Sequence, residues 1–198
     1  MFVEVLEPSV LRMPELSDDA FFDLCTNNEE YRIERTAEGR VIIMSGTGAR
    51  TGARNSRLSA RLLDWSDQDG TGASFDSSTI FRLANSAMRS PDAAWLAFER
   101  MRSLDPRQLD KFLPLSPDFI VELTSPSDRI KDVQLKLEEW IANGVQLGWI
   151  LEVEKRRVHV YRAGSGKAEI LENVNAVQGE GPLATFTLDL TKIWDPGW

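Results

Sequence analysis

The stretch between residues 119 and 153 constrains the fold most, because it has the pattern of a strand, a helix and a second strand. The apolar run FIVEL (residues 119–123) predicts the first strand, and the helix is expected from about residue 129 to 143, ending at Gly144. Such a unit places both strands in one sheet with the helix packed against it. Strands and helices also alternate elsewhere, so the sequence predicts an α/β protein with a mixed sheet.

The remaining elements follow from turn residues and from the spacing of apolar side chains. Ser17 is the expected N-cap of a short helix over residues 18–26, and an N-terminal hairpin comes next. The glycine-rich turn SGTGARTG is expected to lead into a second helix, in which Leu58, Leu62 and Trp65 recur at helical spacing. That helix covers residues 53–67, and the other expected strands cover 31–35, 41–44, 78–83, 92–98, 148–162 as a hairpin, and 168–172.

The size and charge of the chain limit its organisation and its partners. With 198 residues, 42% of them hydrophobic, the chain is expected to form a single domain over residues 1–198, with 1–13 as a loosely attached N-terminal arm. Its 23 basic and 31 acidic residues give a net charge of −8. This charge argues against tight nonspecific DNA binding, although phosphate attraction depends on local charge and a basic strip is compatible with it.

The sequence shows no sign of a membrane segment or of a disulfide. No apolar stretch approaches the roughly 20 residues that cross a bilayer, and the N-terminus lacks the basic start and apolar block of a secretion signal. Cys25 is the only cysteine, so an internal disulfide is excluded. We therefore expect a cytoplasmic protein. Both Cys25 and the single histidine, His159, are interpreted as structural because they lie far apart in the sequence.

The predicted strand at 119–123 carries a carboxylate, Glu122, among apolar residues. A buried carboxylate without partners costs several kcal/mol, so Glu122 requires a cation, a metal ion or strong hydrogen-bond donors. Lys136 lies at the edge of the apolar stripe of the following helix, one turn before Trp140, and its long side chain could reach the strand. The alternative is an ordinary surface lysine paired with Glu139.

A second carboxylate, Asp92, follows Pro91 at the start of another apolar strand. Its alternative role is to cap a turn. Two carboxylates and a lysine at one sheet edge would suit a divalent cation, since Mg²⁺ prefers oxygen ligands and keeps several waters. Such an ion can activate water and stabilise charge in a transition state.

These residues carry a family resemblance. The segments PDFIVELTSPSDR and KLEEWIANGVQLGWILEVEKRRVHVYR, with SPDAAWL and YRIE before them, resemble the Uma-type endonucleases. This family is a branch of the PD-(D/E)XK, restriction-endonuclease-like superfamily, and the resemblance extends from about residue 14 to the end of the chain. It implies an α/β fold with a restriction-endonuclease-like mixed β-sheet core, flanked by helices and preceded by an N-terminal hairpin.

The resemblance also implies roles for particular residues. Asp92 matches the first metal-binding aspartate, and Glu122 matches the acidic residue of the second motif. The lysine usual two residues later is replaced by Thr124, and Lys136 on the next helix is its match. Glu34 matches a further acidic position near the site. Asp92 and Glu122 would hold Mg²⁺ or Mn²⁺, while Lys136 would orient water or balance charge.

The implied activity is metal-dependent endonuclease hydrolysis of phosphodiester bonds in DNA, and a symmetric homodimer would suit cleavage of both strands. The alternative is a catalytically inactive nuclease-fold protein that acts as a DNA-associated or protein-interaction module, which the acidic net charge favours. A hydrolase acting on sugars through paired carboxylates ranks last, because the tryptophans fit core positions better than an open cleft.

A basic strip on the second helix is the candidate contact for nucleic acid. Three of its arginines lie within about 60° of one another around the helix axis, and Arg50 of the preceding turn extends the strip. They would follow the phosphates of DNA, and the alternative is a solvated helix face. The strip consists of Arg50, Arg54, Arg57 and Arg61.

Overall fold

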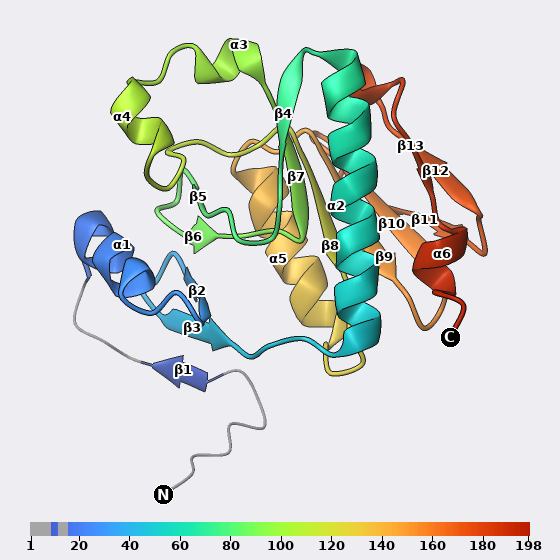
Figure 1. Ribbon diagram of the computed structural model, residues 1–198, viewed down its shortest axis with the longest axis horizontal. Helices are drawn as coiled ribbons and strands as arrows, with labels where there is room; N and C mark the ends of the chain where they lie inside the picture. The colour runs from blue at the N-terminus through green and yellow to red at the C-terminus, as the bar shows by residue number, and fades with distance from the viewer. Residues whose placement is uncertain (1–8, 12–15) are drawn as a thin grey trace, which may run out of the picture.

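A six-stranded sheet forms the centre of the protein in the computed structural model, which describes residues 9–11 and 16–198 (Figure 1). The strand order is β11-β10-β9-β8-β7-β4. Strands β8 and β9 are parallel, with Phe119 opposite Leu147, and the other neighbours pair antiparallel. The strands are β4 (Gly72–Phe75), β7 (Ala93–Ala97), β8 (Phe119–Leu123), β9 (Leu147–Glu152), β10 (Arg157–Arg162) and β11 (Glu169–Glu172).

Two helices cover the two faces of this sheet. Helix α5 (Ile130–Ala142) connects β8 to β9 on one face, and the long helix α2 (Ala49–Asp69) lies on the other (Figure 1). The residues of β8 alternate between the two cores, with Phe119 and Val121 on the α2 side and Ile120 on the α5 side. The predicted strand, helix and strand, and the predicted α/β fold with its mixed sheet, are confirmed.

The C-terminal segment packs on the α2 side of the sheet. A two-stranded sheet of β12 (Ala176–Gln178) and β13 (Thr187–Asp189) is joined by a 3₁₀ turn, Gly181–Leu183, and followed by α6 (Thr191–Trp194). Phe186 stacks on an aromatic ring of β9 and belongs to the same core as the apolar face of α2. The C-terminal segment therefore completes the core on the α2 side.

A smaller sheet lies beside the large one, in the order β1-β3-β2-β6-β5. Helix α1 (Asp18–Thr26) packs on it through Phe21, which belongs to one buried apolar cluster with Ile33 and Val41. Most of the expected N-terminal arm, residues 1–8 and 12–13, lies outside the described residues. The strands are β1 (Ser9–Leu11), β2 (Arg32–Arg35), β3 (Val41–Met44), β5 (Phe81–Arg82) and β6 (Met88–Arg89).

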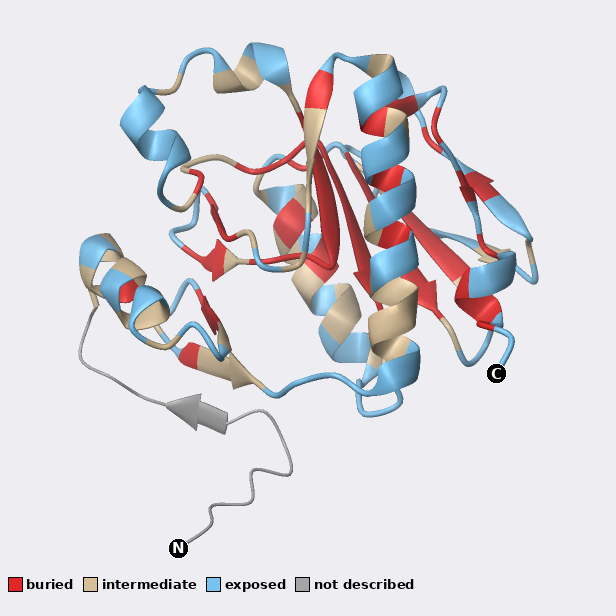
Figure 2. Ribbon diagram, viewed as in Figure 1, coloured by how far each residue is buried: buried red, intermediate tan, exposed pale blue. Residues whose placement is uncertain are grey.

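Two short helices lie in the connection between β7 and β8, α3 (Phe98–Met101) and α4 (Pro106–Leu109). Figure 2 shows that burial is concentrated in β7, β8 and β9, whereas α3 and α4 are largely exposed. No helix in the described part of the chain is long and apolar enough to cross a membrane.

Two boundaries differ from the sequence-based expectations, and the structure adds strands that were not expected, β4 among them. Helix α2 begins at Ala49, so the glycine-rich turn is shorter than expected and Gly52 lies inside the helix. The strand expected over 78–83 is limited to β5. Strand β4 was not expected, because its short sequence GASF has no clear alternation; its first residue, Gly72, lies where an added Cβ would come within 2.4 Å of the Trp95 ring. Tertiary contact, rather than local pattern, therefore specifies this strand.

Candidate active site

The pairing of β7 with β8 brings the two sequence-predicted carboxylates to the same end of the sheet. Ala93 lies opposite Val121 in the antiparallel ladder. The next pair of residues toward that end is Asp92 and Glu122, which therefore come close together. The backbone N–H of Asp92 donates to the carbonyl of Val121 at 3.1 Å. The 30-residue separation of these acids in the sequence is therefore bridged by the antiparallel ladder.

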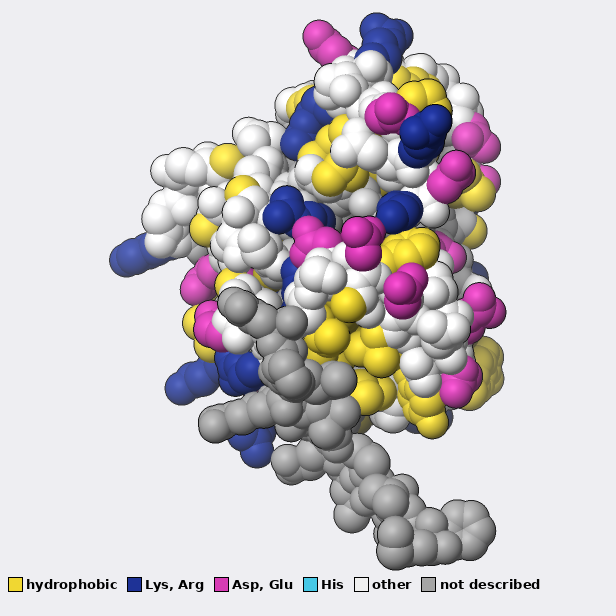
Figure 3. All heavy atoms as spheres, turned by 90° about the vertical axis from the view of Figure 1, so that its left-hand side faces the viewer, with side chains coloured by type: hydrophobic (Ala, Val, Ile, Leu, Met, Phe, Trp, Pro, Cys, Tyr) yellow, Lys and Arg dark blue, Asp and Glu magenta, His cyan; other side chains and the backbone are white. Residues whose placement is uncertain are grey.

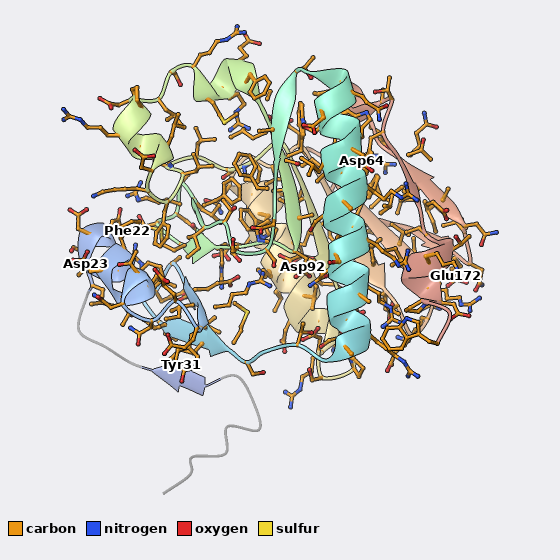
Figure 4. The ribbon with its side chains drawn as sticks, viewed as in Figure 1. Phe22, Asp23, Tyr31, Asp64, Asp92 and Glu172 are labelled. Atoms are coloured by element: carbon orange, nitrogen blue, oxygen red, sulfur yellow. The ribbon has the colours of Figure 1, made fainter. Side chains whose placement is uncertain are left out.

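The Asp92 carboxylate is buried and accepts hydrogen bonds on both oxygens. Its Oδ2 accepts from the backbone N–H of Leu123 at 2.8 Å. Its Oδ1 accepts from Arg32 Nη1 at 3.2 Å and from Asn55 Nδ2 at 3.5 Å. Figure 4 shows Asp92 beside α2, on the side of that helix away from α6. Asp92 is therefore held by β2, α2 and β8 together.

The Glu122 carboxylate points to the α5 side and is buried there. Lys136 Nζ lies 3.0 Å from Glu122 Oε1, and Trp140 Nε1 donates to the same oxygen at 3.2 Å. Both partners come from α5, one turn apart. Glu139, the alternative partner for the lysine, instead accepts from Arg89 at 2.7 Å. Lys136 therefore points into the sheet rather than along the helix surface.

Glu34 completes the cluster from β2. Its Oε1 accepts from Lys136 Nζ at 2.9 Å and from the Ser90 backbone N–H at 3.2 Å, and its Oε2 accepts from Arg89 Nη1 at 3.1 Å. Lys136 Nζ also donates to the Ser90 carbonyl at 2.9 Å. One ammonium group thus bridges two buried carboxylates, Glu34 and Glu122. The structure brings together the four residues predicted from sequence as the site, while their roles stay predictions.

Burial and charge act differently on the ionisable groups of this cluster. Burial raises the pKa of Glu122 to about 7, and the opposing effect of Lys136 is smaller. Burial has the same effect on Glu34, but Lys136 and Arg89 outweigh it and hold the Glu34 pKa below its usual range. For Lys136, burial is outweighed by the two carboxylates, which raise its pKa. Glu122 is therefore the member of this trio that can gain or lose a proton near neutral pH.

The raised pKa of Glu122 predicts that metal-free protein loses stability as pH rises from about 4.5 to about 7. Folded Glu122 keeps its proton through this window, whereas unfolded Glu122 releases it, so the unfolded state binds fewer protons. The loss is expected to reach about 3 kcal/mol, at about 1.4 kcal/mol for each unit of pKa shift. Titration of Glu34 affects stability below this pH window, because its pKa is lowered, and titration of Lys136 affects stability above it, because its pKa is raised.

Urea denaturation in EDTA at a series of pH values measures this effect. The control is Glu122→Gln, which cannot titrate at this position and should show a smaller decline between pH 5 and 8. Parallel curves of stability against pH for the wild type and Glu122→Gln would contradict this prediction, because they would show that Glu122 ionises at the same pH in the folded and unfolded states.

Sequence reasoning missed several residues of the cluster. Arg32 and Glu34 are two residues apart on β2 and so share a face of that strand, which is the one local signal that was available. Arg89 and Ser90 enter from the end of β6, and Asn55 enters from α2. Ser90 begins the segment SPDAAWL that carries the family resemblance, but no sequence pattern indicated a role for Ser90, Arg89 or Asn55, and the fold brings them together.

The arginine strip of α2 faces away from this cluster. Asn55, which contacts Asp92, and Arg57, two residues later, point about 160° apart around the helix axis. Arg54 Nε donates to the Ile193 carbonyl at 2.7 Å, so this arginine holds the C-terminal segment. Arg57 and Arg61 line a hollow of about 240 Å³ together with Asp64, Asp189 and Lys192. Arg54 is therefore engaged by the C-terminal segment, and the contact of the four arginines with nucleic acid stays a prediction. Figure 3, which views the face carrying α1 and α4, shows basic and acidic side chains mixed together.

The donor atoms near Asp92 are suited to a hard divalent cation. Asp92 and Glu122 supply carboxylate oxygens, and the Oδ1 of Asn55, whose Nδ2 donates to Asp92, is buried without a hydrogen-bond partner. In residues 16–198, no group of three or more Asp, Glu, His or Cys side chains is close enough to hold a metal ion by itself. Mg²⁺ commonly binds through one or two carboxylates with waters in its other positions, so this donor set fits such an ion.

The mixed sheet, with helices on both faces and a buried polar cluster at the ends of its inner strands β7 and β8, is the fold of a solved nuclease-like structure. A family model described as "Putative restriction endonuclease" (Uma2) matches residues 18–191, so the chain belongs to the Uma2 family. This confirms the family resemblance seen in the sequence. A crystal structure of "a putative nuclease belonging to DUF820" from Anabaena variabilis is similar, with a TM-score of 0.68 and 18% identity over 82% of this chain and 89% of the other. No curated protein matches the chain.

Proposed function

We propose that this protein is a metal-dependent endonuclease that hydrolyses phosphodiester bonds in DNA. The observation that carries the proposal is the meeting of Asp92, Glu122 and Lys136, from two strands and a helix, in one buried hydrogen-bonded cluster. A bound Mg²⁺ or Mn²⁺ would supply an activated water and neutralise phosphate charge. The family is consistent with this activity.

The chain's own residues have distinct tasks in this proposal. Asp92 and Glu122 would hold the ion, together with a backbone carbonyl near Leu123. Lys136 keeps a positive charge beside the Glu122 carboxylate, where it orients the attacking water and balances developing negative charge. Glu34 positions Lys136 through their 2.9 Å ion pair. Deprotonated Glu122 is the form that binds a cation.

The proposal predicts Mn²⁺ binding that depends on Glu122. Isothermal titration of the wild type should show one Mn²⁺ site per chain, and Glu122→Ala should lose it, because half of the carboxylate charge for the ion is removed. The matched control is Asp118→Asn. Asp118 also follows a proline at a strand start, but it pairs with Arg100 at 2.6 Å and lies at the other end of β8. Equal or absent binding in the wild type and Glu122→Ala would contradict the metal site.

DNA contact is proposed from the family and from the remaining basic residues of α2. Arg50, Arg57 and Arg61 would contact phosphates along the helix, while Arg54 holds the C-terminal segment. Cleavage of supercoiled plasmid to nicked and linear forms in the presence of Mg²⁺ or Mn²⁺ tests the activity directly.

A second candidate function is the catalytically inactive DNA-associated or protein-interaction module. The specific observation in its favour is that the three buried carboxylates already have protein cations, Arg32, Arg89 and Lys136, as partners. A protein of this kind would bind DNA or a protein partner without Mn²⁺ binding and without cleavage.

A further inference from the structure

Arg32 is a cation of the site that the proposed function leaves without a task. Its guanidinium makes three hydrogen bonds: Nε donates to Ser90 Oγ at 2.9 Å, Nη2 to the Ser90 carbonyl at 2.6 Å, and Nη1 to Asp92 Oδ1 at 3.2 Å. Its side chain is 28% exposed, compared with 18% for Lys136 and 11% for Arg89. Arg32 is therefore the cation of this cluster with most access to a bound molecule.

The two bonds to Ser90 fix the guanidinium firmly. Ser90 Oγ donates its own hydrogen to the Ser77 carbonyl at 2.7 Å, so its lone pairs are available to Arg32 Nε. The longest of the three Arg32 bonds is the one to Asp92. Loss of that bond alone would leave the side chain anchored and its Nη1 edge free.

The two oxygens of Asp92 are not equivalent. Oδ2 accepts from the Leu123 N–H in a buried hydrogen bond inside the sheet, whereas the hydrogen bonds of Oδ1 are only partly buried, so Oδ1 is the oxygen nearer to solvent. A carboxylate oxygen has about two acceptor positions, and Arg32 and Asn55 already direct donors at Oδ1. A metal ion that binds Asp92 through Oδ1 must therefore displace one of these two donors, and Arg32 is the charged one.

We propose that Arg32 competes with the metal ion for Asp92 Oδ1 and, once released from it, binds a phosphate oxygen of the substrate through its free Nη1 edge. This inference rests on the proposed function. A guanidinium suits the second task because its planar set of donors matches phosphate oxygens, and its charge persists at every physiological pH. Arg32 is thus both a barrier to metal loading and a substrate-binding residue.

The test variant is Arg32→Met, and two quantities are measured, the Mn²⁺ affinity and the cleavage rate. A purely structural role of Arg32 would change both in the same direction. Titration with Mn²⁺ alone should show about tenfold tighter binding than in the wild type, because a competing donor and a nearby positive charge are removed. Plasmid cleavage at saturating Mn²⁺ should be about a hundredfold slower, because a phosphate contact is lost. The control is Arg40→Met, which removes the same charge from an exposed position of the same hairpin and should change neither quantity.

Weaker Mn²⁺ binding in Arg32→Met than in the wild type would overturn this inference while leaving the proposed function intact. Unchanged cleavage at saturating Mn²⁺ would also overturn it. If neither the wild type nor the variant binds Mn²⁺, the proposed function and the inference fail together. Arg32→Gln, whose amide can still donate to Ser90, replaces Arg32→Met if the circular dichroism spectrum shows that the methionine variant does not fold.

Discussion

Replacing Lys136 by methionine is expected to lower the free energy of unfolding by about 3–5 kcal/mol at pH 8. Its ammonium lies 2.9 Å from Glu34 and 3.0 Å from Glu122, and both carboxylates are buried. Removal of the shared cation leaves Glu34 with Arg89 as its ion-pair partner and Glu122 with only the Trp140 N–H. Urea denaturation in EDTA, monitored by circular dichroism, measures the loss.

The matched control is Lys131→Met, on the same helix but exposed, which should change stability by no more than about 0.5 kcal/mol. The double variant Lys136→Met with Glu122→Gln should recover part of the loss, because the carboxylate that lost its ion pair is then neutral. A cost below about 1 kcal/mol for Lys136→Met would contradict a buried bridge and would place the lysine among solvent-screened surface pairs.

The parts of the site that could be predicted from sequence are those set by local periodicity. Glu122 lies within an apolar strand, and the alternation of β8 fixes the face on which it points. Lys136 lies one turn before Trp140, so the two side chains project together from α5. The structure shows both of them at Glu122. Short-range geometry was enough because strand, turn and helix are consecutive in the chain.

The parts that could not be predicted depend on how the small sheet lies against the large one. Glu34 and Lys136 are 102 residues apart, and Arg32 and Asp92 are 60 apart. Their meeting requires β2 to pair with β6, where Arg35 lies opposite Met88, and β6 to lead directly into β7. Family resemblance indicated Glu34, but the residues alone did not. The one local signal for Arg32 is that it shares a face of β2 with Glu34.

The arginine strip of α2 shows what helical spacing does not predict. The spacing of the four arginines correctly places them on one face of α2, but it does not say what that face contacts. The C-terminal segment folds back onto it, and the carbonyls at the end of α6 attract Arg54. A charge pattern therefore predicts which residues share a surface and leaves the identity of the partner to the fold.

Glu122→Gln is expected to slow DNA cleavage about 1,000-fold, which corresponds to about 4 kcal/mol of transition-state stabilisation. The amide keeps the shape of the side chain, and its oxygen can accept from both Lys136 and Trp140 as the carboxylate does. What it lacks is the negative charge that a divalent cation needs. The variant should therefore stay folded, and above pH 7 it should be more stable than the wild type, because burial penalises the Glu122 charge.

The pairing of lost cleavage with retained or increased stability separates a metal ligand from a structural residue. A structural role would reduce both quantities, since the defect would act through unfolding. Asp118→Asn provides the comparison, because its loss of the Arg100 ion pair affects the fold without touching the cluster. Cleavage by Glu122→Gln at the wild-type rate would place the reaction elsewhere, and the buried acids and cations would then be explained by the DNA-associated module, in which they only hold the small sheet against the large one.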